Sequence, residues 1–232
     1  MYPRRVTTDA ELLRGWGAGD RDAGSRLFEK YLRPLHRFFS NKLASPSDVD
    51  DLVQQTFAAC VASRHRYRAD SSFRTYLYGI ARNVLLKHLT RRRRRHGVVA
   101  SLDAMTMSLA DLGLGQSTAL GLRHEQALLL RALRHIPIDS QIVLEIYYWE
   151  EMTARQVAEV LGVTEPAVRA RLRKAKAELR GALERLARTP AELDSTRGRL
   201  DEWIDTVRRI WYVGEGAPAR RNLRGATGHV DD

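Results

Sequence analysis

The chain has 232 residues, of which 44% are hydrophobic and 29% charged, and it carries a formal net charge of +11. That length allows one or two domains with their own cores, and the composition excludes a mainly disordered chain. No apolar run is close to the length of a membrane span, which is about 20 residues. The N-terminal stretch lacks the apolar segment of a secretory signal.

The cysteine and histidine content argues against a disulfide or a metal site. Cys60 is the single cysteine, and it lies on an apolar helix face where a small inert hydrophobe is expected. The seven histidines never pair with one another or with the cysteine at metal-ligand spacing. We therefore expect no metal, no cofactor and a reducing cytoplasmic location.

The first 43 residues predict two helices. Thr8 and Asp9 can cap a helix that begins near Ala10. A longer amphipathic helix is expected over residues 22–43, where Pro34 should introduce a kink or mark a boundary. The segment 45–47 is expected to be a turn.

Residues 48–95 form the block around which the chain is organised. Apolar residues from Val49 to Val61 recur at the spacing of one helix face. A polar loop follows, in which Ser71 or Ser72 can cap a second long helix. That helix ends in five consecutive arginines, 91–95. No period-2 strand pattern occurs, so the first domain is predicted to be an all-α bundle.

The charge of this block indicates its partner. Residues 64–95 hold eleven lysines and arginines against one acid, Asp70, for a net charge of +10, and tyrosines are interleaved with them. Cations suit a phosphate backbone and flat rings suit unstacked bases, so we interpret the block as binding nucleic acid. The alternative is a solvated basic helix face with tyrosines in the core.

The second half of the chain predicts a linker and another helical domain. Residues 96–122 are rich in Gly, Ser, Ala and Thr and read as a flexible linker. Residues 123–186 carry helical periodicity again, with Pro137 separating the first two helices. The expected fold class is therefore all-α, with two helical domains, 8–95 and 123–186.

The segment 153–179 has the signature of a helix-turn-helix. Thr153 caps the first helix, Gly162 can end it in the left-handed conformation, and Thr164 caps the second. Arg169, Ala170 and Arg173 are expected to point away from the core, with Lys174 and Lys176 beside them. This is the arrangement of a recognition helix in a major groove, and the alternative is an ordinary helical hairpin.

The pairing of DVDDLVQQTF, FRTYLYGIARN and RRRRR with a C-terminal helix-turn-helix resembles the bacterial sigma-70 family, in particular its extracytoplasmic-function (ECF) group. The resemblance covers about residues 8–186. It implies a factor that binds core RNA polymerase and directs initiation at promoters, without bond chemistry of its own. It also implies a possible anti-sigma partner and no membrane insertion.

The resemblance assigns residues to three surfaces. The polymerase-binding surface would comprise Asp51, Leu52, Gln54, Gln55 and Phe57. The −10 surface, which captures a flipped base from the melted strand, would comprise Arg68, Asp70, Ser71, Ser72, Phe73, Tyr76, Arg82, Asn83 and Lys87. The −35 surface would comprise Thr164, Arg169, Ala170, Arg171, Arg173, Lys174 and Lys176.

Two other classes of protein and one extra segment complete the predictions. A stand-alone repressor or activator would use the helix-turn-helix alone, without an aromatic and basic first domain. An enzyme would need clustered carboxylates or a metal site, and the acids 48, 50 and 51 have no distant partner in sequence. Residues 187–232 are expected to form an amphipathic helix and a disordered tail, which either cap the second domain or cover a binding face.

Overall fold

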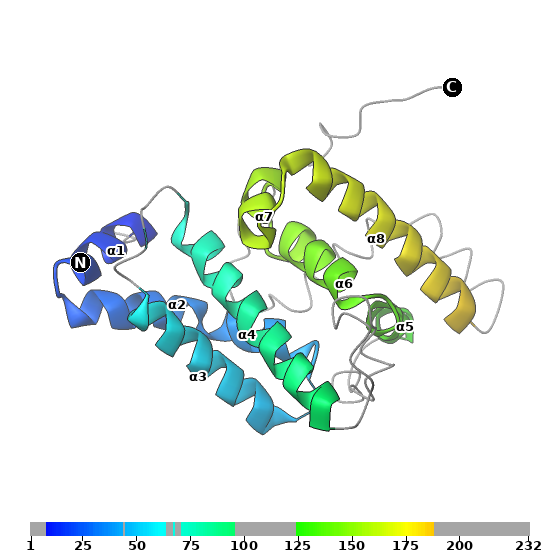
Figure 1. Cartoon of the computed structure of the whole chain (residues 1–232), viewed down its shortest axis with the longest axis horizontal. Helices are drawn as coiled ribbons and strands as arrows, with labels where there is room; N and C mark the ends of the chain where they lie inside the picture. Colours follow the sequence, from blue (N-terminus) through cyan, green and yellow to red (C-terminus); the bar gives the residue numbers. More distant parts are fainter. Residues whose placement is uncertain (1–7, 44, 64–66, 68–70, 96–123, 188–232) are drawn as a thin grey trace, which may run out of the picture.

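The computed structural model describes residues 8–43, 45–63, 67, 71–95 and 124–187, and in these ranges every regular element is a helix (Figure 1). The N-terminal half contains α1 Asp9–Gly17, α2 Arg21–Ser40, α3 Pro46–Ala62 and α4 Phe73–Arg95. The C-terminal half contains α5 His124–Arg134, α6 Ile138–Leu144, a π-helix η2 Glu145–Trp149, α7 Ala154–Leu161 and α8 Glu165–Leu186. The all-α prediction is confirmed.

Local capping chemistry starts α1 as the sequence predicts. The Thr8 hydroxyl accepts from the Glu11 amide at 3.3 Å, while the Glu11 carboxylate accepts from the Thr8 amide at 2.8 Å. These two bonds form a capping box, and the hydrogen bonds that the Glu11 carboxylate accepts from the Thr8 amide and hydroxyl lower its pKa. The helix then packs on α2, where the Trp16 ring lies directly against Gly24. A residue larger than glycine at position 24 would meet that ring.

Two boundaries in the N-terminal half differ from the sequence prediction. Helix α3 begins at Pro46, within the segment expected to be a turn, because Ser45 caps it by accepting from the Asp48 amide at 3.3 Å. Proline at a first helical position costs no hydrogen bond, since that amide has no helical partner. Helix α2 ends at Ser40 and continues through Pro34 as a single element.

Helix α4 lies in the middle of the molecule, with α3 on one side and α6 and α7 on the other (Figure 1). Its core side includes Leu77, Leu85 and Leu89, which are fully buried. Tyr78 is also fully buried, and its ring centre lies 5.5 Å from that of Phe38 in α2. Buried residues of both domains form one continuous cluster.

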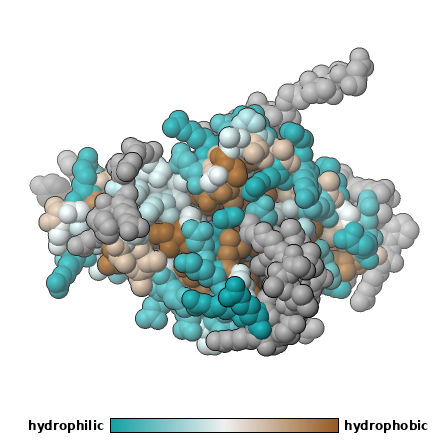
Figure 2. Space-filling model, viewed as in Figure 1, coloured by the Kyte–Doolittle hydropathy of each residue, from teal (hydrophilic) through white to brown (hydrophobic). Residues whose placement is uncertain are grey.

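The helix-turn-helix is confirmed in detail. Thr153 caps α7 with a second capping box, closed by Gln156. Gly162 ends α7 with φ of 66°, a conformation that favours glycine, and Thr164 caps α8. The predicted linker 96–122 and the tail 188–232 lie outside the described residues. On the face in Figure 2, hydrophilic residues cover much of the surface and hydrophobic patches lie along the middle of the molecule.

Candidate nucleic-acid interface

The exposed face of α8 is the first candidate surface. Val168, Leu172 and Ala175 are buried against the domain core, which turns the intervening residues outward. Four residues predicted to read the −35 element are exposed: Arg169, Ala170, Arg173 and Lys174. The helix thus presents three cations and a methyl group on one side, as the sequence analysis predicts.

Ion pairs hold several of these side chains in place. Arg169 pairs with Glu165 at 2.6 Å and Lys174 with Glu178 at 3.7 Å, each within one turn. Such exposed pairs contribute only about 0.3–0.5 kcal/mol, so a phosphate can displace the carboxylate. Arg171 is held differently, because it pairs with Asp139 of α6 at 3.2 Å.

Lys176 also has a partner within the domain. Its ammonium group lies 5.0 Å from the centre of the Tyr148 ring, an arrangement that attracts a cation. Thr164 accepts a hydrogen bond from the Ala167 amide at 3.4 Å, so its hydroxyl serves as the cap of α8. Thr164 is exposed and Lys176 is half-buried.

The start of α4 is the second candidate surface. Ser72 caps the helix by accepting from the Thr75 amide at 3.1 Å, which confirms one of the two predicted caps. The Tyr76 hydroxyl lies 2.6 Å from that of Ser63, and its ring centre is 5.1 Å from that of Tyr67. Tyr76 therefore belongs to a small aromatic pair beside the predicted base-capture loop. Arg68 and Asp70 of that loop lie outside the described residues.

Along the rest of α4, three residues of the predicted −10 surface differ in exposure. Asn83 and Lys87 are exposed, whereas Arg82 is half-buried and its guanidinium lies 4.0 Å from Asp139. The structure therefore brings Arg82 of the −10 set and Arg171 of the −35 set to the same carboxylate.

Two predicted surface residues are in fact core residues. Leu52 and Phe73 are each only 1% exposed, so neither touches a partner in this conformation. Leu52 is on the inward face of α3, and the Phe73 ring centre lies 5.5 Å from that of Tyr31. Leu52 belongs to the apolar face predicted for residues 49–61, and Phe73 belongs to the apolar face that it shares with Leu77 on the next helix; this was the signal against a surface role.

The remaining residues of the predicted polymerase surface lie on the outer side of α3. Asp51, Gln54 and Gln55 are exposed, and Phe57 is half-buried. Gln54 and Phe57 line a groove between α2 and α3. Its flanks include Leu32 and Val61, which are 48% and 43% exposed. Large apolar side chains exposed on neighbouring helices are typical of a protein-docking surface.

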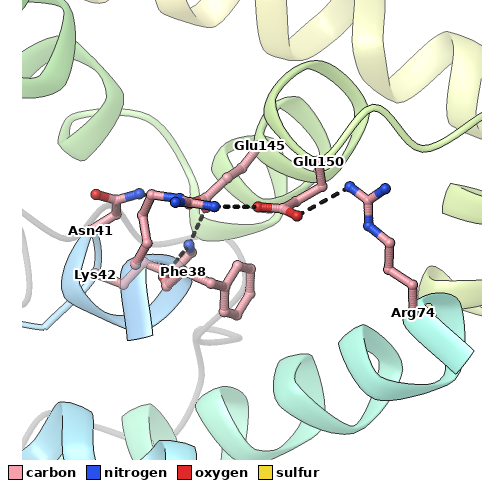
Figure 3. A network of polar contacts seen from close by, with 7 residues as sticks. Phe38, Asn41, Lys42, Arg74, Glu145 and Glu150 are labelled. Atoms are coloured by element: carbon pink, nitrogen blue, oxygen red, sulfur yellow. Dashed lines mark hydrogen bonds and ion pairs between the residues drawn. The ribbon is translucent and has the colours of Figure 1, made fainter. Parts of the chain in front are cut away.

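A buried polar network between the two domains was not predicted. Lys42, two residues after the end of α2, forms an ion pair with Glu145, and their side chains are 0% and 3% exposed (Figure 3). Asn41 donates to the other oxygen of Glu145 at 2.7 Å, and the Lys42 ammonium group donates to the Phe38 carbonyl at 2.7 Å. The Phe38 ring centre lies 3.7 Å from the same ammonium group.

The network continues at Glu150, just after η2. Arg74, from the first turn of α4, donates to Glu150 at 3.1 Å, and Arg37 lies 3.6 Å from its other oxygen (Figure 3). Burial raises the pKa of Glu145 and lowers that of Lys42, and each charge partly offsets the shift of the other. The sequence held one signal of this network: Glu145 is a carboxylate three residues after Ile142, on an apolar helix face.

Within the described residues, no group of three or more His, Cys, Asp or Glu side chains could hold a metal ion. No helix in the same part of the chain is long and apolar enough to cross a membrane.

The fold and these surfaces define a helical DNA-binding protein with a basic, aromatic domain and a helix-turn-helix domain. Two family models match the chain, Sigma-70 region 2 over residues 27–95 and Sigma-70, region 4 over residues 126–179, which together are more than half of it. The chain belongs to the sigma-70 family, in its ECF group. It is therefore a factor for promoter-specific transcription initiation by RNA polymerase.

Individual relatives agree with this family. The ECF RNA polymerase sigma factor SigM of Mycobacterium tuberculosis is 28% identical over 76% of this chain and 85% of SigM. Among solved structures, CnrH in complex with the cytosolic domain of CnrY is 24% identical, with a TM-score of 0.54 over 77% of this chain and 99% of CnrH. The sigma factor RpoE of Bartonella quintana, solved with the anti-sigma factor NepR, is 17% identical, with a TM-score of 0.53 over 69% of this chain and 96% of RpoE.

Proposed function

We propose that three surfaces of the described chain divide the work of a sigma factor between them. The outer side of α3, with the neighbouring groove on α2, docks on core RNA polymerase. The outward face of α8 reads the −35 duplex, and the start of α4 binds the −10 strand once it is single. The chain performs no bond chemistry, which is left to the polymerase, and it acts in the bacterial cytoplasm.

The observation that carries the proposal is the outward face of α8. Arginine can bond both acceptors on the major-groove edge of guanine, so Arg169 and Arg173 are the expected base readers. The methyl group of Ala170 suits contact with a thymine methyl group. Lys174 is the fourth residue of the reading face, while Arg171 and Lys176 lie at its sides and would bind phosphates, which positions the helix without reading sequence.

The −10 strand would bind across the beginning and the exposed flank of α4. Ser71, Ser72 and Asn83 offer hydrogen-bonding groups to an unstacked base, and Lys87 offers a cation to the backbone. Tyr76 would stack at the edge of the melted duplex. Capture of one flipped base offsets part of the cost of unstacking, which amounts to a few kcal/mol.

Polymerase docking would use both polar and apolar contacts. Asp51, Gln54 and Gln55 supply polar groups, while Phe57 and the exposed Leu32 supply an apolar centre. A docking surface of this composition also suits an anti-sigma factor, which we propose as a second partner. The role of residues 187–232 stays a prediction, either as a cap of the second domain or as a cover for a binding face.

The test is run-off transcription with sigma-free core polymerase on a library of promoter fragments, with and without the chain. We expect chain-dependent transcripts that begin downstream of shared −35 and −10 sequences. Tight binding of the free protein to duplex DNA without such transcripts would instead identify a stand-alone repressor or activator.

A matched pair of variants then tests the recognition helix. Arg173→Ala should weaken promoter binding by about 1–3 kcal/mol, and transcription from the selected promoters should fall accordingly. It should also relax the base preference at one −35 position. Arg180→Ala removes an exposed arginine from the same helix two turns further on, and it should leave promoter choice unchanged. Equal effects of the two substitutions would contradict base reading by Arg173.

A further inference from the structure

A cluster of hydroxyl and aromatic groups joins the end of α3 to the start of α4. The hydroxyl of Ser63, the C-cap of α3, lies 2.6 Å from the Tyr76 hydroxyl, which also donates to the Ser63 carbonyl at 3.1 Å. The Tyr67 ring centre lies 5.1 Å from that of Tyr76, and the Tyr67 hydroxyl donates to the Ser71 carbonyl. We call these four residues, Ser63, Tyr67, Ser71 and Tyr76, the hydroxyl frame.

Tyr67 is the member of the hydroxyl frame that none of the predicted surfaces includes. Ser71 and Tyr76 belong to the proposed −10 surface, and Tyr67 contacts both of them, Tyr76 through its ring and Ser71 through its hydroxyl. Tyr67 and Ser71 also stand in sequence on the two sides of residues 68–70, which belong to the predicted base-capture loop. One hydrogen bond therefore ties the two ends of this segment together.

The two serines at the start of α4 have different hydrogen-bonding roles. The Ser72 hydroxyl accepts from the Thr75 amide at 3.1 Å and lies 2.8 Å from the Thr75 hydroxyl, so it is engaged in the cap of the helix. The Ser71 hydroxyl has no hydrogen-bond partner among the described residues, and Ser71 is half-buried. Of the two serine hydroxyls, that of Ser71 is therefore the one ready to bond to an unstacked base.

The bond from Tyr67 restricts where this hydroxyl points. Tyr67 holds the Ser71 carbonyl, and the cap of α4 holds the residue that follows, so the backbone of Ser71 is restrained from both sides. A polar group on a restrained backbone distinguishes bases by where their donors and acceptors lie, whereas a group on a loose backbone adapts to several bases. Restraint of Ser71 thus contributes to base choice.

We propose that Tyr67 is a positioning residue for −10 recognition: its hydroxyl directs Ser71 to the captured base, and its ring supports Tyr76 at the edge of the melted duplex. This inference rests on the proposed sigma-factor function. Tyr67 acts through two residues that meet the strand and needs no DNA contact of its own. A purely structural tie between α3 and α4 would instead affect every promoter sequence alike.

The test uses holoenzyme assembled from core polymerase and the full chain. Its templates are a promoter from the library selection and the single-base variants of that promoter at each −10 position. Run-off transcription gives the ratio of preferred to disfavoured base at each position. The chain variants are Tyr67→Phe, Ser71→Ala and the double variant. Tyr147→Phe is the matched control, because it removes a phenol hydroxyl from η2 in the second domain.

We expect Tyr67→Phe to lower the ratio at one −10 position by about 2- to 10-fold, the worth of one neutral hydrogen bond, while Tyr147→Phe matches the wild type. Ser71→Ala should lower the ratio at the same position. The double variant should lower it no further than Ser71→Ala alone, because Tyr67 acts through Ser71. Unchanged ratios for Tyr67→Phe, an equal loss on all templates, or additive losses in the double variant would each overturn the role of the hydroxyl.

A second variant, Tyr67→Leu, tests the ring. It should reduce transcription from the duplex promoter about 2- to 10-fold more than from a template with mismatches across the −10 element, because an opened template no longer needs the support of Tyr76. Equal reductions on both templates would overturn the role of the ring, and loss of helical circular dichroism in Tyr67→Phe would make Tyr67 a structural residue only. No transcripts from the wild-type holoenzyme refute the sigma function itself; wild-type transcripts with a −10 preference that Tyr67→Phe leaves intact refute only the positioning role.

Discussion

The ion pair of Lys42 with Glu145 gives the sharpest test of the domain contact. Lys42→Met keeps the length of the side chain and removes its charge, which leaves the Glu145 carboxylate 3% exposed and hydrogen-bonded to Asn41. Removal of one partner from a buried pair costs about 3–5 kcal/mol. The Glu145 carboxyl can limit that cost by taking up a proton.

The free-energy cost of protonating Glu145, which caps the destabilisation by Lys42→Met, depends on pH. At pH 7, protonation of a carboxyl group with the ordinary pKa of 4.5 costs about 3.4 kcal/mol, and at pH 5 it costs about 0.7 kcal/mol. Without Lys42 the pKa of Glu145 in the folded chain is raised above its unfolded value. A folded state that holds an extra proton is stabilised at low pH, and this stability is lost as pH rises above 4.5. The variant should therefore be closer to the wild type at pH 5 than at pH 7, by at most about 2.7 kcal/mol.

The measurement is urea unfolding at both pH values, followed by circular dichroism and by tryptophan fluorescence, since Trp149 is 3% exposed and lines the same pocket as Asn41 and Glu145. Lys30→Met is the matched control: Lys30 pairs with Asp9, but its side chain is 53% exposed, so a loss below about 1 kcal/mol is expected. If Lys42→Met behaved like Lys30→Met at both pH values, Glu145 would be in water and the domains would not be docked.

Three other predictions follow from single residues. A Cβ atom at Gly24 would lie 2.6 Å from the Trp16 ring, so Gly24→Ala should lower the free energy of unfolding by about 1–3 kcal/mol, whereas Gly17→Ala, with open space around it, should not lower it. Burial raises the pKa of the Cys60 thiol to about 12, so iodoacetamide at pH 8 should label Cys60 only after denaturant is added; rapid labelling of the folded chain would contradict the burial. Glu151→Gly should raise the melting temperature, because it relieves the left-handed strain of about 1–2 kcal/mol at φ of 48°. An unchanged or lower melting temperature would show that the Glu151 side chain stabilises the folded chain.

Much of the fold could be predicted because its determinants are local. The caps at Thr8, Thr153 and Thr164 bond to amides three residues away, so the sequence shows both partners at once. Gly162 ends α7 because its own backbone adopts the left-handed conformation that glycine favours. The outward face of α8 follows from periodicity alone, since the apolar positions determine which arginines are exposed.

The domain contact could not be predicted in the same way, because its partners are distant in sequence. Lys42 and Glu145 are separated by 103 positions, and no pattern around either residue identifies the other. Leu52 and Phe73 are a different kind of error: the resemblance assigned them to surfaces although their own periodicity placed them inward.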